Sequence, residues 1–311
     1  MSAWRSHGWV LVAAALGLLA CWQPVALYLC ALAVFGLPHV LWEMVWVRRV
    51  WADRLPVAFW CVTALSLLLQ ACARSLLWMA RIDAATAAAC DAATLALALL
   101  ATLLLLPGVP RARRALAGLL GLLLPCALLA VADTPYVMGL LAVLAMAHNF
   151  SPLGLMPLQA RIGQMPARQV LGLLFAAPLL LFGMLWGLDL APSAWAQAGP
   201  TELLWVQGAG HGLAQALLPA LVWAQCLHYL CVLHLMPRAM GQSWSRLPLR
   251  PLALLLSALL LAGFLIDYRA ARGLYAVAAG MHAWLEWPLI MLGLWGWAAA
   301  PQAPSTDKQC R

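Results

Sequence analysis

Apolar runs of membrane-spanning length follow one another through almost the whole sequence. Hydrophobic residues make up 66% of the 311 positions and charged residues only 9%, whereas a soluble domain has about 25% charged residues. A transmembrane helix needs about 20 apolar residues. The sequence therefore predicts an all-α, polytopic membrane protein. Residues 1–299 are expected to form a single integral-membrane helical domain, and the polar residues 300–311 a disordered cytoplasmic tail.

Charged residues and prolines divide the apolar runs into about ten predicted spans. One stretch, 203–236, is too long for a single straight crossing at 1.5 Å per residue. It also contains Pro219, so we expect a short half-helix or surface helix first and a span from about Pro219 onward. The predicted spans lie near 8–22, 24–47, 57–80, 84–107, 115–132, 135–157, 169–189, 203–236, 250–267 and 274–297.

The basic residues indicate how these spans are oriented. With the N-terminus in the cytoplasm, 14 of the 18 lysines and arginines fall in cytoplasmic segments and three fall outside, while Arg74 lies within a span. Basic residues mark the cytoplasmic side of a membrane protein. We therefore expect both termini in the cytoplasm and the protein in a bacterial inner membrane, surrounded by membrane lipids. The net charge of +8 reflects this loop asymmetry and predicts no nucleic-acid partner.

Two pairs of ionisable residues lie inside predicted spans with the same spacing. His39 is followed by Glu43 near the end of the second span, and His282 is followed by Glu286 in the last one. Residues four positions apart share a face of a helix. Ionisable groups inside a membrane are costly and usually functional, so each pair marks a candidate site.

Histidines on two further spans lie at the same predicted depth. His148 and His228 each precede a proline by nine residues, in segments that both read His-x4-Leu-x-Leu-Met-Pro, and His39 precedes Arg48 by nine. At 1.5 Å per residue these three lie about 13 Å from the cytoplasmic boundary, and Glu286 about 16 Å. The sequence thus places four groups in one layer, with His282 one turn deeper and Glu43 one to two turns shallower.

Imidazole and carboxylate groups in one layer are a metal-binding pattern. They are ligands for iron, zinc, copper and manganese, and helix bundles build metal sites between facing helices. The candidate ligands are His39, His148, His228, His282 and Glu286, and either Glu43 or Glu286 is a candidate catalytic proton acceptor. Polar groups that could orient the imidazoles are Asn149, Gln159, Gln225 and Tyr229. The alternative is that such histidines are hydrogen-bonded packing residues.

Other polar residues in the spans have separate interpretations. His234 comes six residues after His228 and faces away from it on a straight helix, which favours a role at the cytoplasmic interface. Arg74 and Asp91 lie opposite each other in a predicted helix hairpin, where an ion pair is expected and a proton pathway is the alternative. Gln207, His211 and Gln215 form a stripe that predicts either a re-entrant element or an interfacial helix.

Two short segments resemble a known family. Gly36-Leu37-Pro38-His39, followed by the acidic Glu43, resembles the Gly-x-Pro-His segment of the bacterial membrane β-carotene 15,15′-dioxygenases, the Brp/Blh family. The helix with His228, Tyr229 and His234 is similar to that family's late histidine helix. The resemblance implies a helical membrane enzyme with histidine-bound iron that uses O2 to cleave β-carotene into retinal, with His39 and His228 as ligands. In this chain Val40 replaces the glycine that follows the family's histidine.

These features together predict a membrane protein with a metal site, most simply a non-haem iron oxygenase, desaturase or hydroxylase that acts on a lipid-soluble, carotenoid-like substrate. Two other functions fit the same residues. A haem b electron-transfer protein would use two of the histidines as axial ligands. A proton- or cation-coupled transporter would use the histidines and glutamates as a relay or cation site. The sequence indicates no particular oligomeric state.

Overall fold

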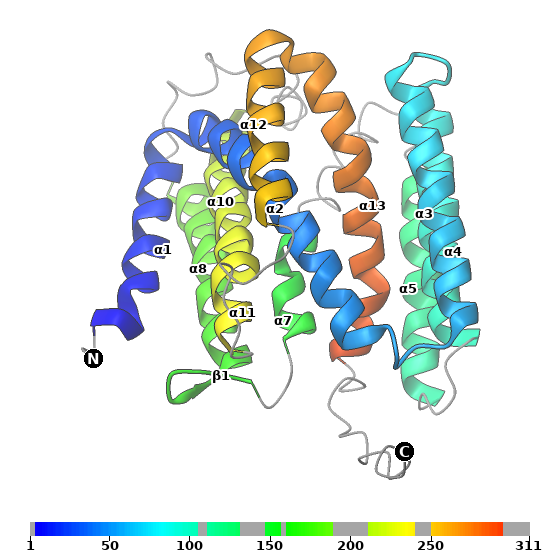
Figure 1. Ribbon diagram of the computed structural model, residues 1–311, viewed down its shortest axis with the longest axis horizontal. Helices are drawn as coiled ribbons and strands as arrows, with labels where there is room; N and C mark the ends of the chain where they lie inside the picture. The colour runs from blue at the N-terminus through cyan, green and yellow to red at the C-terminus, as the bar shows by residue number, and fades with distance from the viewer. Residues whose placement is uncertain are drawn as a thin grey trace.

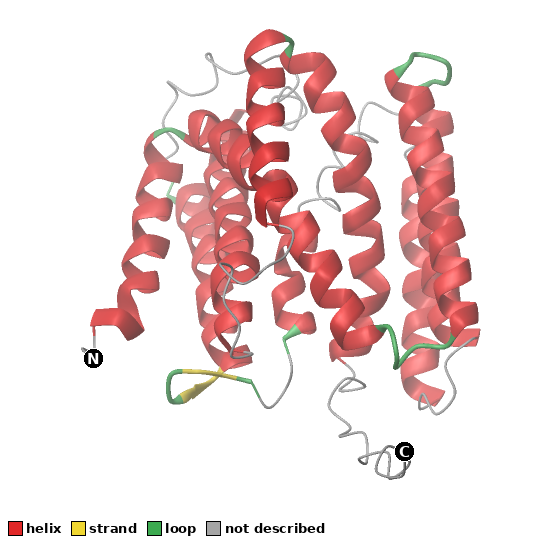
Figure 2. Cartoon of the chain, viewed as in Figure 1, coloured by secondary structure: helices red, strands yellow, loops and turns green. Residues whose placement is uncertain are grey.

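The computed structural model describes residues 4–104, 111–130, 147–156, 160–188, 211–239 and 250–294. This part of the chain is an all-α bundle with one small hairpin of two-residue strands (Figures 1 and 2). Its elements are α1 (Trp4–Trp22), α2 (Pro24–Trp51), α3 (Val57–Trp78), α4 (Ala84–Leu104), α5 (Arg111–Ala130), the 3₁₀ helix η1 (His148–Phe150), α7 (Ser151–Leu155), β1 (Arg161–Ile162), β2 (Met165–Pro166), α8 (Ala167–Gly187), α10 (His211–Leu230), the π-helix η4 (Cys231–Leu235), α11 (Met236–Ala239), α12 (Arg250–Ile266) and α13 (Tyr268–Leu294).

Helices of membrane-spanning length and composition confirm the predicted class of protein. Within the described ranges, five helical stretches are long and apolar enough to cross a membrane: Pro24–Trp51, Val57–Trp78, Ala84–Ala101, Ala167–Gly187 and Ala216–Arg238. Their outward faces carry exposed apolar side chains, such as Leu173 and Leu180 on α8. A soluble monomer rarely exposes so extended an apolar surface, whereas lipid tails cover it without cost.

Two predicted spans differ in detail from the structure. The break expected at Pro219 is absent, because α10 runs without interruption from His211 to Leu230 with Pro219 inside it. Proline is tolerated within membrane helices where neighbouring groups satisfy the freed carbonyl. Residues 203–210, the first part of that stretch, lie outside the described residues, as does the predicted tail at 300–311.

The predicted span 135–157 is described only from residue 147. There the chain forms the 3₁₀ turn η1 and then the five-residue helix α7, instead of one continuous α-helix. Pro152 stands in the first turn of α7. Proline lacks an N–H and clashes with the carbonyl four residues before it, so it favours a helix start at this point.

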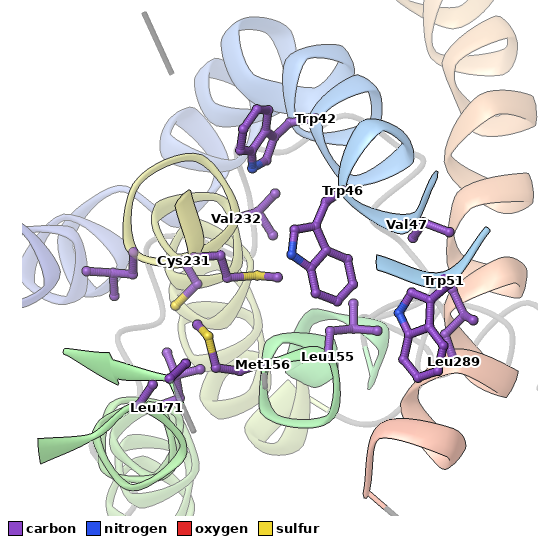
Figure 3. Close-up of a cluster of buried hydrophobic side chains, with 14 of the residues drawn as sticks. Trp42, Trp46, Val47, Trp51, Leu155, Met156, Leu171, Cys231, Val232 and Leu289 are labelled. Carbon is purple, nitrogen blue, oxygen red and sulfur yellow. The ribbon is translucent and has the colours of Figure 1, made fainter. Parts of the chain in front are cut away.

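Two buried apolar clusters hold the bundle together. The larger one packs the second half of α2 against α7, α8, η4 and α13, and α2 contributes Trp42, Trp46 and Trp51 to it (Figure 3). The smaller one contains Tyr28, Val222, Tyr229 and Tyr275 and joins the first half of α2 to α10 and α13. His39 lies on α2 between the residues of the two clusters.

Helices α3, α4 and α5 lie side by side at one edge of the bundle (Figure 1). The predicted ion pair is present here: Nη2 of Arg74 lies 2.6 Å from Oδ2 of Asp91. Helix α13 is hydrogen-bonded to α4 beside this ion pair, because the Trp284 indole N–H donates to the backbone carbonyl of Asp91 at 3.2 Å. Thus α13 connects this edge to the interior, where its histidine lies.

Candidate metal centre

The segment around His39 is shaped by two residues that precede it. Pro38 has no N–H for the carbonyl of Val34, and the Ser257 hydroxyl of α12 lies 2.9 Å from that carbonyl, sharing its proton between it and the Ala253 carbonyl at 3.0 Å. At Gly36 an added Cβ would lie 2.9 Å from the Tyr275 ring. The Gly-x-Pro-His sequence therefore lets α12 and α13 approach α2 closely just before His39.

His39 is held by its own helix. Its Nδ1 lies 2.9 Å from the carbonyl of Phe35, and because a carbonyl only accepts, Nδ1 carries the proton. The Tyr229 ring packs against the imidazole with centroids 4.4 Å apart, and the Gln225 amide donates to the Tyr229 hydroxyl at 2.7 Å. The ring is thereby oriented with Nε2 directed to the interior, where it has no hydrogen-bond partner.

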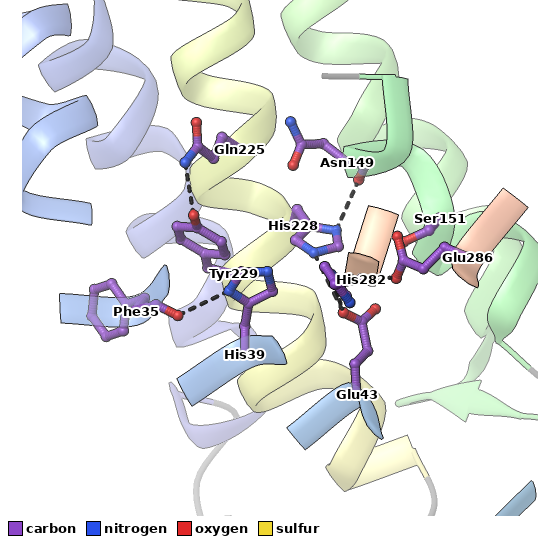
Figure 4. Close-up of polar contacts among 10 residues, drawn as sticks. All are labelled: Phe35, His39, Glu43, Asn149, Ser151, Gln225, His228, Tyr229, His282 and Glu286. Carbon is purple, nitrogen blue, oxygen red and sulfur yellow. Dashed lines mark hydrogen bonds and ion pairs between the residues drawn. The ribbon is translucent and has the colours of Figure 1, made fainter. Parts of the chain in front are cut away.

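His228, on α10, is also oriented by a backbone carbonyl. Its Nδ1 donates to the backbone carbonyl of Asn149 at 3.2 Å, which leaves Nε2 for another partner (Figure 4). Three residues later α10 gives way to the π-helix η4, a wide turn that is frequent at functional sites. His234 lies within η4, half-buried, and belongs to neither group of possible metal ligands, as its six-residue spacing from His228 predicts.

Helix α13 supplies the second histidine–glutamate pair. Glu43 of α2 places Oε2 3.0 Å from Nε2 of His282 and 3.7 Å from Nε2 of His228. Glu286 lies one turn beyond His282, with Oε1 3.8 Å from its Nε2, and the Ser151 hydroxyl donates to that oxygen at 3.0 Å. Both carboxylates are fully buried.

The four imidazoles form a closed circuit. His39 and His148 lie on opposite sides of it, and each is near both His228 and His282, with ring centroids 5.0–5.5 Å apart. Ligand atoms lie within 4.8 Å of one another in two overlapping groups: His39, His148, His228 and His282, and Glu43, His228, His282 and Glu286. All six predicted site residues therefore meet in one cluster.

The predicted positions of Glu43 and His282 need correction. The sequence places Glu43 one to two turns and His282 one turn from the histidine layer, but in the structure Glu43 contacts His282 and His228, and the His282 ring lies beside that of His39. The Cα–Cβ bond of a helical residue tilts toward the N-terminus, so the Glu43 side chain reaches back toward the level of His39. The same tilt brings Glu286 back toward His282.

The cluster has the properties of a metal site. Around an ion bonded at about 2.0–2.2 Å, ligand atoms lie at most about 4.4 Å apart, close to the 4.8 Å within which the ligand atoms of each group lie. Nε2 of His39, Nε2 of His228 and Nδ1 of His282 are buried without a hydrogen-bond partner. Such orphaned groups are destabilising unless something binds them, and a cation would satisfy them.

The groups that orient the imidazoles were only partly predictable. Tyr229 and Gln225 act together on His39, as described above, whereas the predicted Gln159 lies outside the described residues. The carbonyls of Phe35 and Asn149 carry no sequence signal, because every residue has a backbone carbonyl. Ser151 was also not predicted; its one signal is its position three residues after His148.

Known proteins provide no further guide to this centre. No protein-family model, curated protein or solved structure matches the chain. The fold and the site therefore define the class of protein by themselves: an all-α bundle with membrane-spanning helices, and a buried histidine–glutamate cluster that could hold a metal ion.

Proposed function

We propose that this chain is an integral membrane oxygenase of a bacterial inner membrane. It holds one iron ion at His39, His148, His228 and His282, with Glu43 and Glu286 beside it, and oxidises a lipid-soluble, carotenoid-like substrate with O2. The observation that carries this proposal is the convergence of four imidazoles from α2, η1, α10 and α13 at one point in the interior of the bundle.

The arrangement of the rings favours an ion over a haem. Axial ligands of a haem stand on opposite faces of a flat porphyrin, which must fit between them. Here neighbouring rings are 5.0–5.5 Å apart at their centroids and close a circuit. Four rings held this close to one another favour a single ion among them over a porphyrin between two of them.

Charge balance favours one divalent ion for each chain. Imidazole ligands are neutral, and an uncompensated charge is expensive in a buried, lipid-surrounded site. The carboxylates of Glu43 and Glu286 together carry two negative charges when ionised, which offset the two positive charges of one ion. Imidazole and carboxylate are ligands that iron accepts.

Each side chain then has a distinct task. The imidazoles bind the ion, which when it is iron supplies the activation of O2. Glu43, through its contact with Nε2 of His282, orients that ring, and its other oxygen can accept a proton from the substrate. The apolar outer surface suits a protein that meets a lipid-soluble substrate in the bilayer, and the resemblance to the Brp/Blh family supports a carotenoid as its class.

The proposal includes ten spans with both termini in the cytoplasm. The start of α1, the turn between α2 and α3, the β1–β2 hairpin and the end of α13 all lie at one end of the bundle (Figure 1). The turns between α3 and α4 and between α12 and α13 lie at the other. This arrangement supports the orientation inferred from the basic residues.

The test is metal binding and O2 consumption by the purified, detergent-solubilised protein. After anaerobic loading with Fe(II), we expect one iron per chain, no Soret band, and O2 uptake with cleavage or hydroxylation products when β-carotene is added. His39→Ala and His228→Ala should lose the iron. His234→Ala is the matched control, since His234 shares the α10–η4 stretch with His228 but lies outside the cluster, and it should retain the iron.

Three results would overturn the proposal. A Soret band would favour the haem alternative. Full iron content in His39→Ala would place the ion elsewhere. Function that survives complete removal of metal would favour a proton-coupled transporter.

A further inference from the structure

The segment 147–156 contributes to the cluster at three points. It carries the His148 ring, the Asn149 carbonyl that accepts from His228, and the Ser151 hydroxyl that donates to Glu286. The other cluster residues belong to helices of 20–28 residues. This described segment has only a 3₁₀ turn and a five-residue helix, and so short a helix is not stable by itself. Contacts with other elements must therefore hold it.

One contact fixes α7 against α13. A Cβ added at Gly154 would lie 2.9–3.1 Å from the side chain and backbone of Ile290. The two helices thus touch almost backbone to backbone, one turn beyond Glu286. This contact sets the distance between α7 and α13 near the C-terminal end of α7, but it provides no hydrogen-bond donor for the last carbonyls of that helix.

Arg168 secures that end. Its Nε donates to the carbonyl of Met156 at 2.9 Å, and its Nη2 donates to the carbonyl of Gly154 at 3.1 Å. The last carbonyls of a helix lack intrahelical donors, and a cation there also interacts favourably with the helix dipole. Arg168 stands in the first turn of α8, directly after a hairpin closed by the bond from Ala167 N to Ala160 O at 2.9 Å.

We infer that Arg168 is a positioning residue for the metal centre: it clamps the end of α7 and so holds His148, Asn149 and Ser151 in register with α10 and α13. The inference rests on the proposed function, because it assumes that the cluster binds a metal ion. A guanidinium is a rigid planar fork with several donors, whereas a lysine ammonium is a point charge on a flexible stem. Only arginine spans both carbonyls with fixed geometry.

The experiment compares Arg168→Met, Arg168→Lys and the native full-length chain, using Co²⁺ as the probe ion in detergent. Arg161→Met is the matched control, because Arg161 is an exposed arginine on β1, in the hairpin that directly precedes α8. Outer groups that orient ligands typically change metal affinity by about 10- to 100-fold, and we expect a loss of about tenfold for Arg168→Met. Arg168→Lys should lose less, and Arg161→Met nothing.

A second readout separates positioning from simple destabilisation. At saturating Co²⁺, the visible absorption bands of Arg168→Met should differ from those of the native chain, because the His148 imidazole is displaced. A lower melting temperature with native affinity and native bands would overturn the inference. If Arg168→Met does not fold, Arg168→Lys decides, and native affinity and bands in that variant would refute it. Failure of the native chain itself to bind Co²⁺ would instead reject the proposed function.

Discussion

Glu43 is a fully buried carboxylate whose near neighbours are imidazoles and the carboxylate of Glu286. Among the described residues of the metal-free protein, only imidazoles face its charge within ion-pair distance, and a buried carboxylate without a permanent cation beside it is unfavourable. With an ion bound, the same charge offsets the positive charge of the metal. We therefore expect Glu43 to contribute to metal affinity more than to the stability of the metal-free fold.

Glu43→Gln separates these two effects. The amide keeps the shape and removes the charge, so we expect metal affinity to fall by about 10- to 100-fold while the melting temperature of the metal-free protein stays the same or rises. Chelator competition and thermal melting with and without metal measure both. A large loss of metal-free stability with native affinity would show that Glu43 is structural.

Gly36 is the residue that lets Tyr275 pack beside His39. Gly36→Ala adds a methyl group 2.9 Å from the ring, and overpacking of this kind costs about 1–3 kcal/mol. We expect a lower melting temperature and weaker metal binding. The control is Gly172→Ala on α8, where an added Cβ meets nothing within 4 Å; alanine is the better helix former by up to about 1 kcal/mol, so that variant should be as stable as the native chain or more so.

At the scale of elements, the end of α3 shows local strain. Ala80 has a φ of 52°, and it follows α3 in a turn where the N–H of Arg81 reaches the carbonyl of Leu76 at 2.9 Å. Glycine is the usual residue at this position of such a helix end. Ala80→Gly should therefore stabilise the protein by about 1 kcal/mol, measured by thermal melting. Ala89→Gly inside α4 should do the reverse, and equal effects would contradict this account.

The ion pair between α3 and α4 gives a second prediction at this scale. Asp91 has no exposed surface and its carboxylate lies 2.6 Å from Arg74. Removing one partner of a buried pair costs about 3–5 kcal/mol, because the other charge is left alone. Arg74→Met should lower the melting temperature strongly, and Arg74→Met combined with Asp91→Asn should recover much of it. No recovery in the double variant would mean that the pair itself stabilises the hairpin.

At the scale of the whole molecule, the ends of the bundle should face different compartments. Gln164 in the β1–β2 turn and Arg81 between α3 and α4 lie at opposite ends (Figure 1). A membrane-impermeant thiol reagent applied to intact spheroplasts should label Arg81→Cys, and it should label Gln164→Cys only after permeabilisation. The native chain gives the background from its own cysteines. The opposite pattern of labelling would invert the proposed topology.

The sequence by itself determined the fold class, the approximate limits of most described helices and the common level of His39, His148 and His228. These are local properties, since apolar length sets where a helix can span and the rise per residue sets depth along it. His39, His148 and His228 were thus placed in one layer before any contact was known. The spacing of Arg74 and Asp91 across a short turn was local in the same sense.

The tertiary structure decided which side chains converge in the candidate metal centre and which groups orient them. The rotation of each helix about its axis depends on packing between segments far apart in the sequence. This packing brings Glu43 into contact with His282 and keeps His234 out of the cluster. Ser151, the Asn149 carbonyl and the Arg168 clamp follow from the same packing. A sequence fixes how deep a residue lies along its helix, but only neighbouring helices fix the direction in which its side chain points.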